Sequence, residues 1–524
     1  MKKSTISKTL LTGLLLVMGS TLASCSNEPV EILRIRNSED YIYKFEEEGD
    51  LPDLVDQFEE YMYKEYGRNV EVVYSTFDTN EKLYNDLKLG KSNYDLIVPS
   101  DYMIQKLLAL DLLEPFDFDS EDLYMENVDN YLSPYIKDVI SSIESVNGYN
   151  LADYSIPYMW GTIGIMYNPE FYISRGFTEE EIDEAFTSYD VLYDERFKGT
   201  ISIKDSVRDL YAVGVVHIEK HKEEIIALQT QLKNEQITNE AYHEKIVEIF
   251  NRNDDEVLEL VQEDLIAMKE NSFGFEVDGG KNDMVNGTIG ANLCWSGDAV
   301  YSIEEAASDE DNPTEIRFSV PTSDTISNIW FDCFVMPKSD SLNKELAQKF
   351  VDFIYDPEIA ALNMDYIGYT CAAGGDDILN MMYDYYDVRG VDEDYVRITE
   401  VDPELVEGDD YVKYDLTYFF EGTIDNIEDA VLLVEPDAPL GQLRAKFVEK
   451  EDLDYLAIMK DFGDRNEAVM HMWEKVRTSP VPNFVAVMLI VELVIAITVI
   501  AFFIIIKSRN KKEIRKILDS KESK

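Results

Sequence analysis

The sequence is poor in the residues that bind metals or grip nucleic acid. Its 524 residues include 4 Cys, 4 His and 47 Lys plus Arg, against 105 Asp plus Glu, for a formal net charge of −58. Nucleic-acid binding depends on neutralising phosphates with basic side chains, so the composition argues against that function. The motif HIEKH (217–221) lacks the glutamate that follows the first histidine of a zinc-protease site. We expect no metal and no cofactor.

Cysteine is too sparse for a disulfide framework. Apart from Cys25, the chain has only Cys294, Cys333 and Cys371, an odd set. One pair is possible, but we expect buried free thiols. The absence of internal repeats argues against an adhesin or a structural surface protein. What the chain does contain is 45% apolar and 12% aromatic residues, including 33 Tyr, enough for more than one globular unit.

The first 24 residues have the pattern of a secretion signal. Lys2, Lys3 and Lys8 come before an apolar stretch that closes on small residues. The run LASC (22–25) is similar to a bacterial lipobox. Residues 1–24 are therefore predicted to be a lipoprotein signal peptide, with Cys25 as the lipidated first residue of the mature protein. The alternative is an ordinary signal peptide followed by an incidental cysteine.

An apolar run near the other end predicts a transmembrane helix at residues 484–506. The run has 23 residues with one charge, Glu492, and a helix needs about 20 residues to cross a bilayer. The tail at 507–524 is basic. The positive-inside rule therefore places the tail in the cytoplasm and residues 26–483, which carry the acidic excess, outside the cell membrane.

Strand-like and helical patterns alternate between these two ends. The strand patterns lie at 30–35, 70–77 and 94–100, and the helical patterns lie at 51–67, 80–90 and 102–113. Such an order predicts an α/β fold with a mostly parallel sheet. Ligands bind at the carboxyl ends of such strands, where Asp40, Thr79 and Ser100 fall. Further along, residues 206–270 have the pattern of charged surface helices, and 288–295, 316–320 and 329–337 that of strands.

Two of the strand-like stretches place a tryptophan near an aspartate. Side chains two apart in a strand point the same way, so Trp330 and Asp332 share one face. An indole face and a carboxylate together suit a cation. The alternative is a tryptophan at a sheet edge with a solvated acid. In the other stretch Asp298 follows Trp295 by three residues, where it fits a helix N-cap as well as a site.

Five longer segments resemble, in order, segments of the spermidine/putrescine-binding proteins of bacterial polyamine ABC transporters, over about 31–372. They are VYSTFDTNEKLYNDLK, YDLIVPSDYMIQKL, DYSIPYMWGTIGIMYN, LYDERFKGTISIKDSVRDLY and IGYT. The resemblance implies an α/β, two-lobed type II periplasmic-binding-protein fold with an interlobe cleft, to which this chain adds the transmembrane helix. Lobe one would comprise 30–157 with 329–372. Lobe two would comprise 158–328 with 373–480, including the helices at about 206–270.

The resemblance also implies a ligand site, in which aromatic side chains flank a polyamine and carboxylates meet its ammonium groups. The matching positions are Asp40, Tyr41, Ser100, Tyr102, Asp209, Trp295, Trp330, Asp332 and Tyr369. The chain departs from the family pattern at three points. Ser38 replaces a tryptophan, Ser206 replaces an aspartate with Asp205 just before it, and a glutamine has no clear counterpart in 374–480.

The implied function is an extracytoplasmic substrate-binding protein that captures spermidine or putrescine and delivers it to an ABC permease with its ATPase. An alternative is a sensor or receptor of the same fold for another cationic solute. A third reading is a hydrolase with paired carboxylates. It has little support, because neither a nucleophile motif nor a metal cluster accompanies the acids. The sequence does not select one polyamine over another.

Overall fold

The computed structural model describes residues 30–45, 51–90, 93–143, 145, 147–219, 223–276, 279–308, 313–322, 326–399 and 411–479. The predicted signal peptide, Cys25, the predicted transmembrane helix at 484–506 and the tail at 507–524 lie outside these residues. Within the described ranges, no helix has both the length and the apolar character that crossing a bilayer requires.

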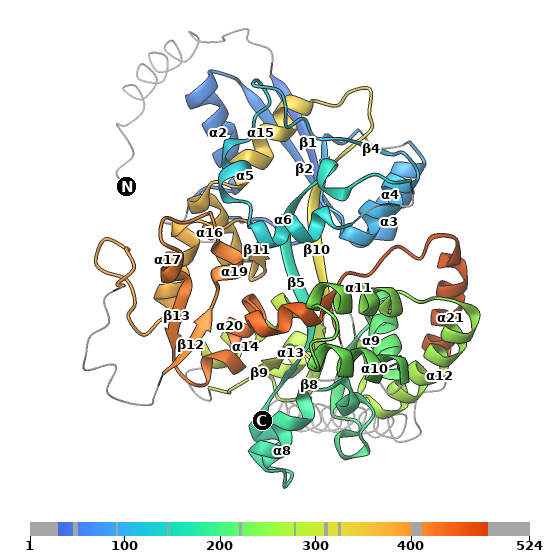
Figure 1. Cartoon of the computed structure of the whole chain (residues 1–524). Coiled ribbons are helices and arrows are strands. Elements are labelled where there is room, and N and C mark those ends of the chain that lie inside the picture. The colour runs from blue at the N-terminus through green and yellow to red at the C-terminus, as the bar shows by residue number, and fades with distance from the viewer. Residues whose placement is uncertain are drawn as a thin grey trace, which may run out of the picture.

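A parallel sheet forms the half of the molecule at the top of Figure 1. Its strands are β1 (Glu31–Ser38), β2 (Val70–Phe77) and β3 (Leu96–Ile97), with β1 pairing in parallel to both others. They alternate with α2 (Leu54–Tyr66), α3 (Asn80–Lys88) and α4 (Asp101–Ala109). Helix α2 buries Leu54, Phe58 and Met62, whose spacing of four residues gives one apolar face. The alternation predicted from the sequence is confirmed here.

The opposite half holds a second parallel set of strands. They are β6 (Ile201–Lys204), β7 (Gly274–Glu276) and β8 (Ala291–Trp295), and β6 pairs in parallel with both neighbours. The helices of this half include α7 (Pro169–Ile173), α8 (Glu179–Phe186), α13 (Gly279–Val285) and α14 (Ser296–Ser308). The short strand β9 (Arg317–Ser319) pairs with the last residues of β5 (Ser155–Tyr167).

Two long antiparallel strands, β5 (Ser155–Tyr167) and β10 (Ser327–Pro337), join the halves (Figure 1). The sheet order is β2-β1-β3-β10-β5-β8-β6-β7. One end of β10 pairs with β3 and β4 (Leu113–Glu114), and the far end of β5 pairs with β8. The sequence pattern indicated a mostly parallel sheet. The antiparallel pair differs because it carries the chain between two parallel sets.

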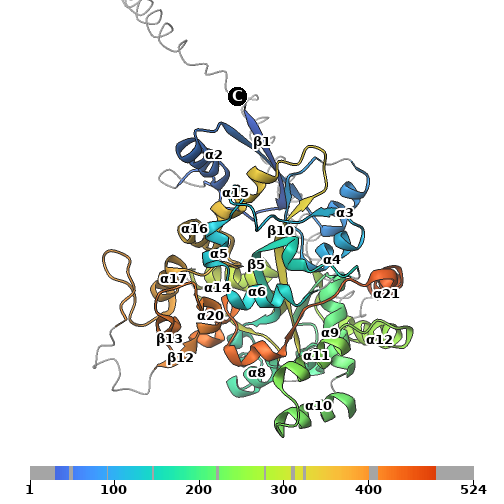
Figure 2. The same cartoon turned by 45° about the horizontal axis from the view of Figure 1, so that its top comes forward.

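The chain after β10 covers the flank of the molecule and then crosses to the second half (Figures 1 and 2). Two short helices from earlier in the chain, α5 (Glu126–Tyr131) and α6 (Pro134–Ser141), lie near this region. The helices and strands that follow β10 are α15 (Lys344–Ile354), α16 (Pro357–Ile367), β11 (Thr370–Cys371), α17 (Asp376–Tyr386), β12 (Val412–Asp415), α19 (Thr417–Phe420), β13 (Val431–Val434), α20 (Gln442–Lys446), β14 (Leu456–Ala457) and α21 (Asn466–Thr478).

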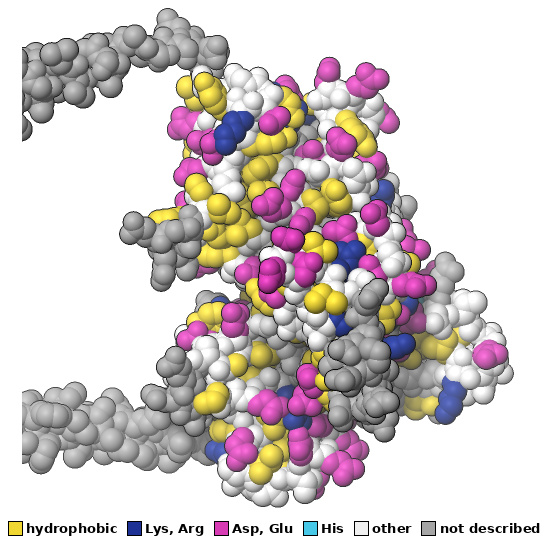
Figure 3. Space-filling view, turned by 90° about the vertical axis from the view of Figure 1, so that its left-hand side faces the viewer, with side chains coloured by type: hydrophobic (Ala, Val, Ile, Leu, Met, Phe, Trp, Pro, Cys, Tyr) yellow, Lys and Arg dark blue, Asp and Glu magenta, His cyan; other side chains and the backbone are white. Residues whose placement is uncertain are grey.

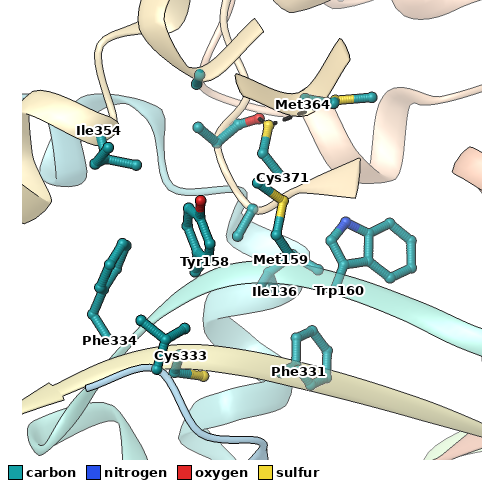
Figure 4. Packing of buried hydrophobic residues seen from close by; sticks show 14 of the residues in the cluster. Ile136, Tyr158, Met159, Trp160, Phe331, Cys333, Phe334, Ile354, Met364 and Cys371 are labelled. Carbon is teal, nitrogen blue, oxygen red and sulfur yellow. Dashed lines mark hydrogen bonds between the residues drawn. The ribbon is translucent and has the colours of Figure 1, made fainter. Parts of the chain in front are cut away.

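Buried side chains form two hydrophobic clusters. The first includes Tyr158 and Phe331 and, from the later chain, Tyr383 and Phe447. Figure 4 shows part of it, where side chains of β5 and β10 lie together with Ile354, Met364 and Cys371. The second cluster includes residues of β6 and β8 and reaches Trp473 in α21. Segments of 373–480 thus pack into both clusters, and the predicted lobe boundaries stay a prediction.

The helices in 206–270 are α9 (Val207–Glu219), α10 (Glu223–Lys233), α11 (Asn239–Phe250) and α12 (Asp255–Asn271). The sequence predicted helices with charged faces in solvent. Helix α9 corrects this, because it is buried from Arg208 to Val216. Its first turn contributes Arg208 and Asp209 to the interior of the molecule. The three described cysteines are free and buried, as predicted.

Candidate functional site

Tyr41 and Asp332 form the first part of the candidate site. Tyr41 follows the end of β1, and its hydroxyl donates a hydrogen bond of 2.9 Å to Oδ2 of Asp332 on β10. Along β10, Trp330 and Asp332 are half-buried whereas Ile329, Phe331 and Cys333 are buried. The prediction that Trp330 and Asp332 share one face is therefore confirmed.

Aromatic rings pack beside this carboxylate. The ring centre of Tyr369 lies 5.5 Å from that of Trp330 and 5.7 Å from that of Tyr41, in edge-to-face geometry. Two glycines make the arrangement possible. A Cβ atom at Gly161 would lie 2.6 Å from Cζ2 of Trp330, and one at Gly297 would lie 2.4 Å from the Tyr369 ring.

Burial changes the proton affinity of the acids here. It raises the pKa of Asp332 to about 6, although hydrogen bonds from Ser100 and Tyr41 act in the opposite direction. Burial also raises the pKa of Asp101 to about 7, against the hydrogen bond that Phe331 N donates to Asp101 Oδ2 at 2.9 Å. Both acids therefore hold protons more strongly than exposed aspartates do.

A second carboxylate, Asp209, lies on the same side of β10. Trp295 donates its indole N–H to Asp209 Oδ2 at 2.9 Å, and Asn328 donates its amide to Asp209 Oδ1 at 3.4 Å. Asn328 precedes Asp332 by four residues, so both side chains point to the same face of the strand. Their Cα atoms are separated by about 13 Å, from a rise of about 3.3 Å per residue.

A third carboxylate, Asp298, connects the two parts. Tyr369 donates its hydroxyl to Asp298 Oδ1 at 3.4 Å. Lys204 forms an ion pair with Asp298 Oδ2 at 2.8 Å, and its Nζ lies 4.4 Å from the centre of the Trp295 ring. Asp298 is the third residue of α14 and is buried, so it is not the N-cap that one reading of the sequence allowed.

The cluster contains seven of the nine residues that the resemblance implied. Ser100 lies against Asp332 through a backbone bridge, and its hydroxyl accepts a hydrogen bond of 2.9 Å from Asn80. The Tyr102 hydroxyl donates to Glu81, which is outside the cluster, at 3.2 Å. Asp40 lies apart, with a side chain that is 90% exposed and paired with Lys44 at 3.5 Å.

The guanidinium of Arg208 lies over two aromatic rings, those of Tyr102 and Phe462. Its guanidinium carbon lies 4.3 Å from the ring centre of Tyr102 and 4.3 Å from that of Phe462. Asp205 and Ser206 stand where the family pattern has an aspartate. Asp205 pairs with Arg477 at 3.1 Å. The Ser206 hydroxyl accepts a weak hydrogen bond of 3.5 Å from the backbone N–H of Asp209. Neither supplies a carboxylate to the cluster.

Sequence reasoning missed Lys204 and Asn328. For each residue, its position in the sequence pattern could have indicated a role. Lys204 is the last residue of a parallel strand, the position where α/β proteins place functional groups. Asn328 stands two residues before Trp330 and therefore on its face of the strand.

The two acids Asp209 and Asp332 differ from Asp298 in their partners. Among the residues that the structure describes, neither Asp209 nor Asp332 forms an ion pair, and each accepts hydrogen bonds from uncharged groups. A buried carboxylate without a cationic partner is unfavourable unless it is protonated or a ligand supplies the charge. The arrangement is therefore suited to bind positively charged groups beside aromatic rings.

Comparison with known proteins identifies the family of the chain. Residues 53–373 match the family described as bacterial extracellular solute-binding protein. The chain belongs to this family. Members bind solutes and do not transform them, so the chain is not an enzyme. Its fold is the α/β fold of periplasmic binding proteins.

Relatives within the family have named ligands. The chain is 26% identical over 340 residues to the putrescine-binding periplasmic protein PotF of Escherichia coli, covering 65% of this chain and 77% of PotF. It is 25% identical over 320 residues to the spermidine/putrescine-binding periplasmic protein of the same organism, covering 61% and 73%.

Solved structures share the fold. The substrate-binding protein PotD of a spermidine/putrescine ABC transporter from Streptococcus pneumoniae superposes with a TM-score of 0.51 at 22% identity, covering 86% of this chain and 100% of that one. The lipoprotein Tp0655 (TpPotD) of Treponema pallidum gives a TM-score of 0.52 at 16% identity, covering 85% and 99%.

Proposed function

We propose that this member of the solute-binding family captures a polyamine, putrescine or spermidine, and delivers it to the permease of an ABC transporter. The observation that carries the proposal is a pair of acids, the buried Asp209 and the half-buried Asp332, that have no ion-pair partner among the described residues. Both lie beside aromatic rings, Trp295 in one case and Tyr41 in the other. The names of the relatives support the same class of ligand.

The ligand would lie along the face of β10 that carries Asn328, Trp330 and Asp332. One ammonium group would bind Asp332 and another Asp209, with Trp330, Tyr369 and Trp295 along the methylene chain. A charge-assisted hydrogen bond contributes about 1.5–3 kcal/mol and a cation–π contact about 0.5–2 kcal/mol. Ser100 and Tyr102 would border this site, and Asp40 would stay outside it.

Binding would close two lobes on the ligand, as in a type II binding protein. The strands β5 and β10 are continuous through both halves and would act as the connection about which the lobes move. Asp332 belongs to a strand that both halves share, whereas Asp209 lies in the first turn of a helix of the second half. A ligand that contacts both would favour the closed state.

The acidic surface would assist capture. On the face drawn in Figure 3, acidic side chains are spread widely and basic ones are few. Such a field raises the association rate of a cation at low ionic strength. A lipid on Cys25 and a membrane helix at 484–506 would hold this acidic part at the outer face of the cell membrane, close to the permease.

Isothermal titration calorimetry on the full chain in mild detergent tests the proposal. Putrescine and spermidine should each be offered at neutral pH, with a neutral sugar and an acidic amino acid as controls. We expect saturable heat with a polyamine and none with the controls. Binding of a different cationic solute, with no polyamine response, would favour the sensor or receptor reading instead.

A further inference from the structure

The ammonium group of Lys204 occupies a cation subsite within the cluster. Its Nζ is 2.8 Å from Asp298 Oδ2 and 4.4 Å from the ring centre of Trp295. The Lys204 side chain is 3% exposed and that of Asp298 is 7% exposed. An ammonium group between an indole face and a carboxylate has the contacts that a ligand amine would make.

Charge holds Lys204 in this position. Burial acts against its charged form, but the charge of Asp298 and the hydrogen bond to it outweigh burial and raise the pKa of Lys204. A second lysine, Lys281, reaches Asp298 Oδ1 at 3.6 Å, yet its side chain is 32% exposed. Lys204 is thus the buried partner of Asp298, and Lys281 is a more exposed one.

The acids Asp298, Asp209 and Asp332 therefore differ in whether the protein itself supplies a cationic partner. Asp298 is compensated by the protein, while Asp209 and Asp332 form no ion pair within the described part of the chain. A ligand needs to bring one positive group to each of the two uncompensated acids. A third positive group would have only Asp298 to bind, and Asp298 is already paired with Lys204.

We propose that Lys204 serves as a built-in ammonium group that restricts this site to diamines and disfavours triamines. The inference rests on the proposed polyamine function and assigns its substrate class. A triamine that placed an amine at Asp298 would displace Lys204 and leave a buried lysine without its partner, which is strongly unfavourable. A diamine satisfies Asp209 and Asp332 and leaves the Lys204 pair intact.

The test compares putrescine and spermidine by calorimetry on the full chain and on variants. The wild type should bind putrescine more tightly. In Lys204→Met the position of the buried ammonium group between Asp298 and Trp295 is open to a third amine, and the ratio of spermidine to putrescine affinity should rise by about tenfold or more. Lys281→Met is the matched control. It removes a cation from the same carboxylate but not from the Trp295 ring, and should change the ratio by less than about threefold.

Lys204→Gln is a second variant that keeps the test valid if Lys204→Met does not fold. Glutamine keeps a neutral donor for Asp298 while it removes the positive charge. At equal concentration, the ligand with the higher affinity stabilises the folded state more, so spermidine should raise the melting temperature of this variant more than putrescine does. The two variants thus give independent readouts.

The outcomes separate the two proposals. If the wild type binds putrescine and the ratio is unchanged in both Lys204 variants, the role of Lys204 is overturned while polyamine binding stands. A wild type that prefers spermidine also overturns it. If the wild type binds no polyamine, both proposals fail together.

Discussion

The hydroxyl of Tyr41 donates a hydrogen bond of 2.9 Å to the carboxylate of Asp332, across 291 positions of sequence. This contact joins the end of the first strand to the long strand β10. It orients one acid of the candidate site toward the rings of Tyr369 and Trp330. The hydrogen bond is made by a neutral donor, so the charge of Asp332 is left for a ligand.

Removing that charge should weaken binding. In Asp332→Asn the side chain keeps its shape but loses a charge-assisted contact of about 1.5–3 kcal/mol, which corresponds to about a 10- to 100-fold loss of polyamine affinity. Thermal shift and calorimetry measure the loss. Asp40→Asn is the matched control, because Asp40 is 90% exposed and lies outside the cluster. Equal effects of the two substitutions would contradict the assignment of Asp332.

Polyamine affinity should fall as the pH falls below about 6. Burial raises the pKa of Asp332 to about 6, so at lower pH the acid is neutral and must release a proton before it can pair with an ammonium group. The amines stay charged throughout. Affinity should drop toward a limit of about tenfold per pH unit from this one acid. Calorimetric titrations across this range measure the slope, and Asp332→Asn should flatten it.

Asp101 should make the ligand-free protein less stable as the pH rises. Acids in ion pairs, whose pKa values are lowered, have the opposite effect. Burial raises the pKa of Asp101 from 3.8 to about 7, so the folded state holds a proton that the unfolded state releases. The free energy of unfolding should therefore decrease as the pH rises through this window. Chemical denaturation at several pH values measures it.

Asp101→Asn should reduce that pH dependence, since the amide oxygen still accepts the Phe331 N–H but no longer titrates. Asp111→Asn, at an acid whose side chain is 69% exposed, is the matched control for the change from acid to amide. Stability that rises with pH through the same window in the wild type would rule out a neutral Asp101 in the folded protein.

Alanine substitutions at two glycines of β5 should have similar effects on stability but different effects on ligand binding. A Cβ atom at Gly161 would meet the Trp330 ring at 2.6 Å, and one at Gly164 would meet the Phe318 ring at 2.2 Å. Both alanine substitutions should lower the melting temperature, because each side chain overpacks a ring. Only Gly161→Ala should also weaken polyamine affinity, since it displaces Trp330. Equal affinities in the two variants would place Trp330 outside the site.

Much of the fold could be predicted from local pattern. The alternation that gives β1, α2, β2, α3 and α4 is visible because each element has one buried face with its own period. The long strand β5 was not identified from its pattern. All 13 of its residues are buried, so no alternation marks it, and a buried strand and a buried helix look alike in sequence.

The candidate site was predicted in part. The shared face of Trp330 and Asp332 follows from strand geometry alone. The other implied positions came from the resemblance, and the structure gathers most of them but leaves Asp40 in solvent. The place of Lys204 at the end of a strand could have marked it as a candidate, but its burial against Asp298 depends on a contact between distant segments that no local pattern predicts.

The sequence by itself determined which residues share a face and which class of ligand the composition allows, because both depend on neighbours a few positions apart. Only the tertiary structure decided which carboxylates are already paired. Asp298 meets the charged Lys204 across 94 positions, whereas Asp332 accepts a hydrogen bond from the uncharged hydroxyl of Tyr41 across 291. Such pairings depend on strand order and on the packing between strands, and these are set by the burial of the whole chain rather than by any local segment.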